Sequence, residues 1–420
     1  MQNDLPPAYS HLSDKVGLKV KKSRLERLKF RRQLWLKVHL WLGLTAGAAL
    51  VIIGLTGSIM VFWEELDEWL NQNVMRVEMP STGSRAFRPM TEIEASVKAV
   101  LPPRAKSGVY NYPRHEQSVF IFWYSTPGKN TPDLATQNLF INPYTAQITG
   151  SRVFYSADSP LQHCFIGFIF KLHYALLLKD MGVVIVGILA LLLLISILTG
   201  LIVWWPLTGK WAQAFTLKRH ASVERFNFDL HKTSGVYTSL VLGAVLLSGV
   251  YLNLPNQFHW LVQQFSPKSR GPDSPSPQST FIPNGIAIGL DKAMAIVDSA
   301  YPGGRWHTLK NPDDKQDVYS LTRIDVTELS PFWSERTVTL DQYSGNILEV
   351  RAPDTRRSAG EIFLDWQWPL HSGKAFGWSG RILVFLSGVA CPVLFVTGMI
   401  RWLQKRRSKK LKISPSPSKS

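Results

Sequence analysis

Four of the ten histidines stand at positions that recur along the chain. His39 and His231 each come four residues before a glycine at the start of a long apolar run, and they are 192 residues apart. His173 and His371 each come shortly before another apolar run, 198 residues apart. Two facing imidazoles within a helical bundle are suited above all to axial ligation of a haem iron. The sequence therefore predicts two bis-histidine haem sites with these four residues as ligands.

Each of these histidines lies near the boundary of a segment long enough to cross a bilayer. About 20 apolar residues in a helix span a hydrocarbon core about 30 Å thick, and a spanning helix satisfies all of its own backbone polar groups. A shorter apolar stretch, 161–178, contains Lys171 and His173 and is not expected to span. We predict a four-helix transmembrane core whose spans are 38–63, 181–205, 233–254 and 382–402.

Basic residues indicate which segments face the cytoplasm. Residues 1–37, 206–232 and 401–420 contain 23 of the 47 Lys and Arg residues but only five of the 30 Asp and Glu residues. The positive-inside rule therefore places the arm 1–37, the loop 206–232 and the tail 403–420 in the cytoplasm. Contact with anionic lipid explains these clusters, and no nucleic-acid binding is predicted.

The same rule sorts the rest of the chain by membrane face. Segments 64–180 and 255–381 are expected outside, which makes the protein a multi-pass membrane protein with both termini cytoplasmic. His39 and His231 then lie at the cytoplasmic face, and His173 and His371 at the outer face. The first apolar run is read as an uncleaved anchor, because it is too long for a signal peptide and has no A-x-A-like cleavage site.

An internal repeat accounts for the doubled pattern. Thr56-Gly57 aligns with Ser248-Gly249, and Thr199-Gly200 aligns with Thr397-Gly398. The outer segments share a strand-turn-strand pattern, "INPYTAQITG" and "LDQYSGNILE", each preceded by a helical pattern. The chain is therefore predicted to be two parallel copies of one unit, a helix in, an outer α+β module and a helix back. The Ser/Pro-rich stretch 266–279 is predicted to be a flexible linker.

Glycines are expected beside the haems. Gly57 and Gly249 each follow their helix's histidine by 18 residues, which is five turns or about 27 Å, so histidine and glycine share a face. We expect Gly57 and Gly249 opposite the outer macrocycle, and Gly43 and Gly235 beside the inner one. Plain helix packing is the alternative explanation for such small residues.

Other residues are weaker candidates. Zinc or copper fits less well, because each face supplies two recurring histidines and a closed zinc site normally has four ligands. Cys164 and Cys391 are expected on different levels, so no disulfide is predicted. The acidic "WEELDEWLNQ" is read as a solvated helix end rather than a cation site. The propionates of the outer haem are expected to pair with Arg381 or Lys171, and those of the inner haem with Arg32 or Lys37. Three further histidines are read as surface residues: His163, His259 and His307.

The histidine patterns, "TGLIVWWP" after the second span and the paired strand-turn-strand segments resemble the PepSY-associated transmembrane family, over roughly residues 30–405. That family includes iron-uptake factors and ferric-siderophore reductases. The resemblance implies a four-helix membrane core carrying two PepSY-like α+β modules on the periplasmic side. It also implies two b-type haems held by the helix histidines, which here are His39, His231, His173 and His371.

The implied function is electron transfer across the membrane to a ferric siderophore, which releases iron as Fe(II). Some relatives carry a cytoplasmic flavin or nicotinamide domain, but no such motif occurs here, so a separate cytoplasmic or membrane electron donor is expected. Two alternatives stay open: a haem conduit to a different periplasmic acceptor, and a haem-free membrane protein whose PepSY-like modules bind partners.

Overall fold

The computed structural model describes most of the chain. The residues that it describes are 8–81, 86–128, 134–159, 161, 164–207, 209–218, 220–267, 275–329, 332, 334–355 and 357–413, and among these the side chains of 8–25, 29, 107 and 409–413 are left aside. His163, the middle of the predicted linker 266–279 and the two ends of the chain lie outside the described residues.

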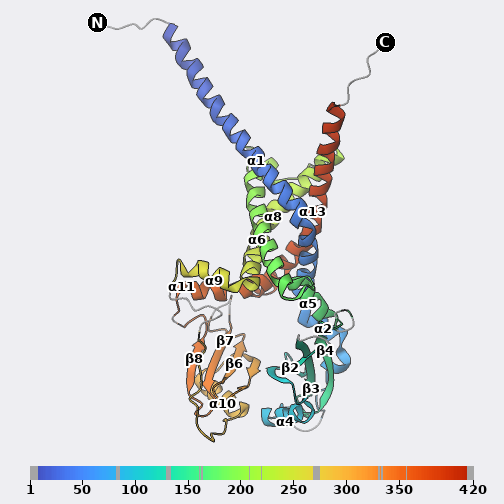
Figure 1. The fold of residues 1–420 in the computed structure, drawn as a ribbon, viewed down its shortest axis with the longest axis vertical. Coiled ribbons are helices and arrows are strands. Elements are labelled where there is room, and N and C mark those ends of the chain that lie inside the picture. Colours follow the sequence, from blue (N-terminus) through green and yellow to red (C-terminus); the bar gives the residue numbers. More distant parts are fainter. Residues whose placement is uncertain are drawn as a thin grey trace, which may run out of the picture. The chain divides into compact units, whose positions relative to one another are not determined.

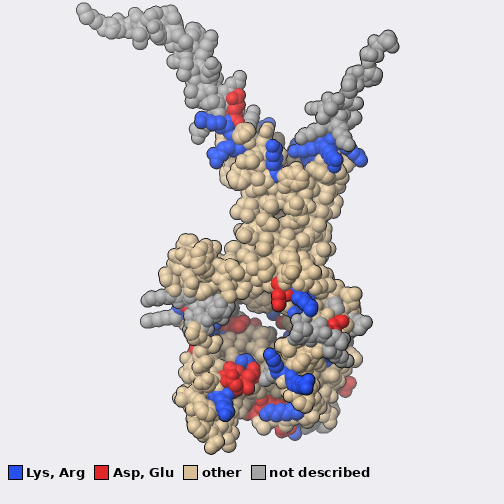
Figure 2. Space-filling model, in the orientation of Figure 1, with Lys and Arg blue, Asp and Glu red and all other residues tan. Residues whose placement is uncertain are grey.

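The described part of the chain contains four long apolar helices, as the sequence predicts. They are α1 (Ala8–Met60), α6 (Lys179–Trp204), α8 (Val223–Asn253) and α13 (Gly377–Ile413). Each contains a stretch long and apolar enough to cross a membrane. Figure 2 shows a broad uncharged surface over these helices. Lys and Arg side chains gather at the upper end of this surface. We conclude that the chain is a membrane protein whose helices contact lipid.

The chain divides into two compact units, which we describe separately. The first comprises residues 1–55, 188–247 and 387–420, and the second comprises 56–187 and 248–386. In the first unit, small residues bring helices close together: a Cβ at Gly47 would meet the ring of Phe395, and one at Gly54 would meet Cys391. A short helix, α7 (Trp211–Phe215), packs its aromatic rings on Trp204.

The second unit contains one continuous antiparallel sheet of eight strands in the order β4-β3-β2-β1-β5-β6-β7-β8. Val109 to Asn111 of β1 pair with Thr308 to Lys310 of β5, which joins the two halves of the sheet. The sequence predicted two outer modules, and in the structure these share a single sheet. The strands are β1 (Lys106–Asn111), β2 (Phe120–Pro127), β3 (Leu134–Ile141), β4 (Ile148–Tyr155), β5 (Arg305–Lys310), β6 (Val318–Ile324), β7 (Arg336–Asp341) and β8 (Ile347–Arg351).

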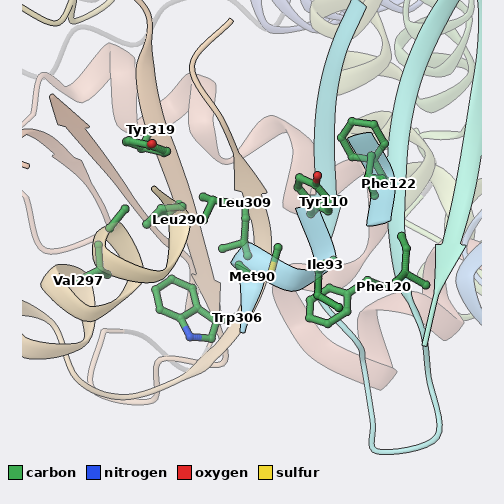
Figure 3. Packing of buried hydrophobic residues seen from close by; sticks show 14 of the residues in the cluster. Met90, Ile93, Tyr110, Phe120, Phe122, Leu290, Val297, Trp306, Leu309 and Tyr319 are labelled. Atoms are coloured by element: carbon green, nitrogen blue, oxygen red, sulfur yellow. The ribbon is translucent and has the colours of Figure 1, made fainter. Parts of the chain in front are cut away.

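Two helices cover one face of this sheet and form its core. Helix α4 (Met90–Val100) precedes β1, and α10 (Leu290–Ala300) precedes β5. Their apolar faces pack against alternate strand residues across both halves, as Figure 3 shows. The Asp291 carboxylate of α10 accepts hydrogen bonds from the backbone N–H groups of Met90 and Thr91, so one half caps the helix of the other. The two halves therefore share one core.

Shorter helices connect the sheet to the ends of the long helices within the second unit (Figure 1). These shorter helices carry the outer histidines, an acidic segment and an exposed apolar face. These helices are α2 (Trp63–Leu70), α3 (Gln72–Met75), α5 (Phe165–Ala175), α9 (Pro255–Gln263), α11 (Ala359–Asp365), α12 (Gln367–Ser372) and the single-turn η1 (Lys374–Phe376).

Candidate functional site

The first unit brings His39 and His231 together. His39 lies on α1 and His231 on α8, and their ring centroids are 6.2 Å apart with an angle of 67° between the ring planes. Nδ1 of His39 lies 2.9 Å from the carbonyl oxygen of Ser196 on α6. Nδ1 of His231 lies 3.0 Å from the carbonyl oxygen of Leu394 on α13. Because a carbonyl oxygen only accepts, Nδ1 carries the hydrogen in both rings and Nε2 keeps its lone pair.

Hydroxyl groups add to this anchoring. Thr397 Oγ1 lies 3.0 Å from Nδ1 of His231, and Ser196 Oγ lies 3.2 Å from Nδ1 of His39. Thr199 donates a hydrogen bond to the Ser196 carbonyl that also anchors His39. Each ring is thus held by the helix that faces it, which fixes its orientation and its tautomer.

The second unit brings His173 and His371 together in the same way. They lie on the short helices α5 and α12, and their ring centroids are 6.0 Å apart with an interplanar angle of 59°. Nδ1 of His173 lies 3.2 Å from the hydroxyl of Thr56, and Nδ1 of His371 lies 3.0 Å from that of Ser248. The four histidines singled out in the sequence therefore form two pairs, each paired as predicted.

Glycines lie directly against the imidazole rings. A Cβ built at Gly200 would be 3.0 Å from Cε1 of His39, one at Gly398 would be 3.2 Å from Cε1 of His231, and one at Gly57 would be 2.9 Å from Cε1 of His173. The sequence placed Gly57 opposite a macrocycle, but in the structure it contacts a histidine ring. At Thr56-Gly57, Thr199-Gly200 and Thr397-Gly398 the glycine thus makes room for a ring, and a hydroxyl in the same turn helps to anchor it.

The spacing of each pair fits two ligands on one metal ion. With metal–nitrogen bonds of about 2.0–2.1 Å and about 1.1 Å from Nε2 to the ring centre, two imidazoles on opposite sides of one ion would have centroids roughly 6.3 Å apart, against about 5 Å at a tetrahedral angle. The observed separations are 6.2 and 6.0 Å. Among the described residues, no group of three or more His, Cys, Asp or Glu side chains is arranged to hold a metal. Within the described ranges of the chain, each pair would therefore suit a group that takes two protein ligands, such as haem, better than a closed zinc site.

Two cations expected to meet outer haem propionates have protein partners. Arg381 forms an ion pair with Glu65 at 2.8 Å and lies over the rings of Phe62 and Trp378. Lys171 contacts the hydroxyl of Tyr174 and lies 5.0 Å from the centre of the Tyr155 ring. These protein contacts account for the positions of the Arg381 and Lys171 side chains.

On the inner side, Arg32 donates to the carbonyl oxygen of Val203. This interaction gives it a structural role at the end of α6.

The acidic segment at the start of the second unit is mostly buried and ion-paired, so reading it as a solvated helix end was wrong. Arg152 forms a two-pronged interaction with Asp67, whose side chain is 2% exposed. Glu68, with a side chain 5% exposed, is paired with Arg76 and Arg114. Burial alone would raise the pKa of Glu68, but hydrogen bonds from the two arginines outweigh it and lower that pKa below its ordinary value.

Two of the three further histidines singled out in the sequence, His259 and His307, lie in described parts of the second unit. His259 is half-buried on α9. His307 lies on β5 and lines a small cavity with Glu64, Arg114 and Ser118. Burial lowers the pKa of His307, so it is neutral near pH 7. Neither residue belongs to a histidine pair.

Comparison with known families now bears on this geometry. The family described as "PepSY-associated TM region" matches residues 36–405, a range that includes all four paired histidines. The chain belongs to the PepSY-associated TM family. No curated protein matches the chain. This family membership confirms the resemblance seen in the sequence and agrees with the four apolar helices of the structure.

Proposed function

We propose that this PepSY-associated TM protein is a di-haem electron-transfer protein. His39 and His231 hold one haem b, and His173 and His371 hold the other. The observation that carries the proposal is the spacing of the two pairs, 6.2 and 6.0 Å between ring centroids, together with carbonyl anchors at Nδ1 of the inner pair that leave Nε2 there as the ligand atom. Bound haem would supply one-electron redox chemistry.

The protein's own residues supply position and environment. Ser196 and Leu394 hold the inner rings through their carbonyl groups, and the Thr56 and Ser248 hydroxyls contact the outer rings. A fixed ring orientation keeps the geometry of the metal site constant between redox states, which lowers the reorganisation needed for each transfer.

The direction of transfer follows from the proposed topology. Basic residues at 1–37, 206–232 and 401–420 support cytoplasmic termini and a bacterial inner-membrane location, with the sheet in the periplasm. A cytoplasmic or membrane-bound donor would then deliver electrons at His39 and His231. His173 and His371 would stand at the periplasmic end of the path.

For the acceptor we propose a ferric siderophore. One electron converts its Fe(III) to Fe(II), and the hard oxygen ligands of a siderophore hold Fe(II) far more weakly, so reduction releases the metal for uptake. The protein is then a membrane ferric-siderophore reductase. Support for this step is membership of the family and the proposed haem pairs.

Reduction of the purified protein, followed by stopped-flow reoxidation with candidate ferric siderophores, tests this function. We expect a bis-histidine haem spectrum, two haems per chain and reoxidation that becomes faster with siderophore concentration. A reduced protein that ferric siderophores leave reduced, but that a periplasmic redox protein reoxidises, would favour the general electron conduit. A protein that binds no haem on expression with excess haem would overturn both and leave a PepSY membrane protein that acts through partners.

A further inference from the structure

Helix α9 begins directly after a candidate membrane-spanning helix. One non-helical residue, Leu254 with φ −129° and ψ 56°, separates α9 from the end of α8, and Pro255 occupies its first turn. The sequence of α9, PNQFHWLVQ, contains no Asp, Glu, Lys or Arg. In the second unit α9 lies beside α11 (Figure 1). An uncharged helix that continues from a membrane span has no evident reason to face bulk water.

One face of α9 is fixed by ring packing. Phe258 is buried, and its ring is stacked on that of Phe363 of α11, with centroids 6.1 Å apart and planes 12° from parallel. The same ring packs edge-on against Tyr251 at the end of α8 at 5.5 Å. Val262, one turn further on, is also buried. These contacts determine how α9 is rotated about its axis and therefore which side chains point outward.

Large apolar side chains cover much of the outward face. Trp260 is 64% exposed, Leu261 is 48% exposed and Phe265, just beyond the helix, is 84% exposed. Ile362 of α11 and Trp368 of α12 are also exposed. Contact of apolar side chains with water is unfavourable. Clustered exposed apolar residues therefore commonly mark an interaction surface.

We propose that the exposed apolar side chains of α9 and its end, Trp260, Leu261 and Phe265, together with Ile362 of α11 and Trp368 of α12, form a lipid-binding surface that lies in the interfacial region of the bilayer beside the end of α8. Continuity with α8 places it near the membrane boundary, and tryptophan is enriched at that depth because it has an apolar body and a polar N–H. Exposed Asn256, Gln257 and Gln264 add polar amides to the outward side of α9, a mixture suited to the headgroup region.

The composition of α9 also predicts how its binding depends on the charge of the lipid headgroups. Because α9 carries no basic residue, its binding comes from apolar burial rather than from attraction to anionic headgroups. Zwitterionic and anionic bilayers should therefore hold it equally. This inference does not depend on the proposed haems, and it stands or falls separately from the proposed electron transfer.

Spin labelling in nanodiscs tests the surface. A Cys164→Ala background in which buried Cys391 takes up no label provides the starting protein. Labels are attached at Phe265→Cys and, as a matched control, at Ile286→Cys, because Ile286 is an 88% exposed apolar residue of the same unit in the loop before α10. Power saturation compares each label's access to oxygen, which partitions into lipid, and to a nickel chelate, which stays in water.

We expect oxygen to relax the label at 265 more than the nickel chelate does, and the reverse at 286. The result at 265 should be the same in nanodiscs of phosphatidylcholine and of phosphatidylcholine with phosphatidylglycerol. Equal nickel access at 265 and 286 would overturn the proposal. Dipolar broadening at 265 would also overturn it, because it would show that a second copy of the chain covers the face. A label at 265 shielded from both reagents would point to a protein partner instead.

Discussion

Thr397 Oγ1 lies 3.0 Å from Nδ1 of His231, and the residue that follows Thr397 is the glycine whose missing Cβ leaves room for the same ring. The ring is therefore held at Nδ1 and given space at Cε1 by two consecutive residues of α13. Thr56 and Gly57 hold the ring of His173 in the same way, with the hydroxyl 3.2 Å from Nδ1 and the glycine facing Cε1.

Removal of a single ligand should remove a single haem. His39→Ala and His231→Ala should each reduce the haem content from two to one per chain by loss of the inner haem, and His173→Ala and His371→Ala should do so by loss of the outer haem. Pyridine haemochrome assays on purified variants give the ratio. Two haems retained in all four variants would rule out the ligand assignment.

Loss of the Thr397 hydroxyl should weaken the inner site without destroying it, because His231 keeps its contact with the Leu394 carbonyl. Groups that orient a metal ligand typically contribute about 10–100-fold in affinity. We expect Thr397→Val to release the inner haem to apomyoglobin about 10-fold faster than the wild type, whereas Thr397→Ser should behave like the wild type. Equal release from the Val and Ser variants would show that the hydroxyl has no such role.

A methyl group at Gly57 should disturb the outer site alone. Its Cβ would lie 2.9 Å from Cε1 of His173, so the ring must move. We expect Gly57→Ala to change the g-values of the outer haem in EPR and to leave those of the inner haem unchanged. Gly243→Ala is the control, because a Cβ there meets no described atom within 4 Å. Identical EPR spectra for both variants would contradict the contact.

Acid should destabilise the second unit through Glu68. Its native pKa is lowered by Arg76 and Arg114, so the carboxylate stabilises the fold above its unfolded pKa of about 4.3, and this contribution is lost as pH falls toward the lower native pKa. Glu68→Gln should cost about 1–3 kcal/mol at pH 7. Thermal unfolding between pH 7 and pH 3.5 should show a smaller loss of Tm in Glu68→Gln than in the wild type, and parallel losses would exclude Glu68 as a source of acid sensitivity.

The topology can be checked with reporters. Alkaline phosphatase fused after Ser420 should be inactive and green fluorescent protein at the same place should be fluorescent, because we expect the C-terminus in the cytoplasm. The reverse pattern would exchange the faces assigned to both histidine pairs.

The sequence predicted the features that depend on local pattern. Apolar length located the four long helices, and the recurring spacing singled out the histidines that the structure pairs. Helical periodicity also placed His39 and Gly57 on one face of α1. It could not reveal that Gly57 faces a ring carried by α5, because the period of one helix does not specify its neighbour.

Pairing between distant segments was beyond the sequence pattern. Arg114 and Arg152, which pair with Glu68 and Asp67, are 46 and 85 residues further along the chain, so an acidic run looked solvated when read alone. Likewise, alternation of apolar residues predicts strands but not which edges join, and the pairing of β1 with β5 carried no local signal.

That pairing also sets an order of events during biogenesis. Val109 pairs with Lys310, which lies about 200 residues later in the chain. When the ribosome has completed the first four strands, the β1 edge is an unpaired row of N–H and C=O groups, a template for aggregation. It stays open until α8 has been made and β5 has followed it. In the proposed topology this delay includes membrane insertion of α8, so a periplasmic chaperone that shields strand edges would assist this protein during translocation.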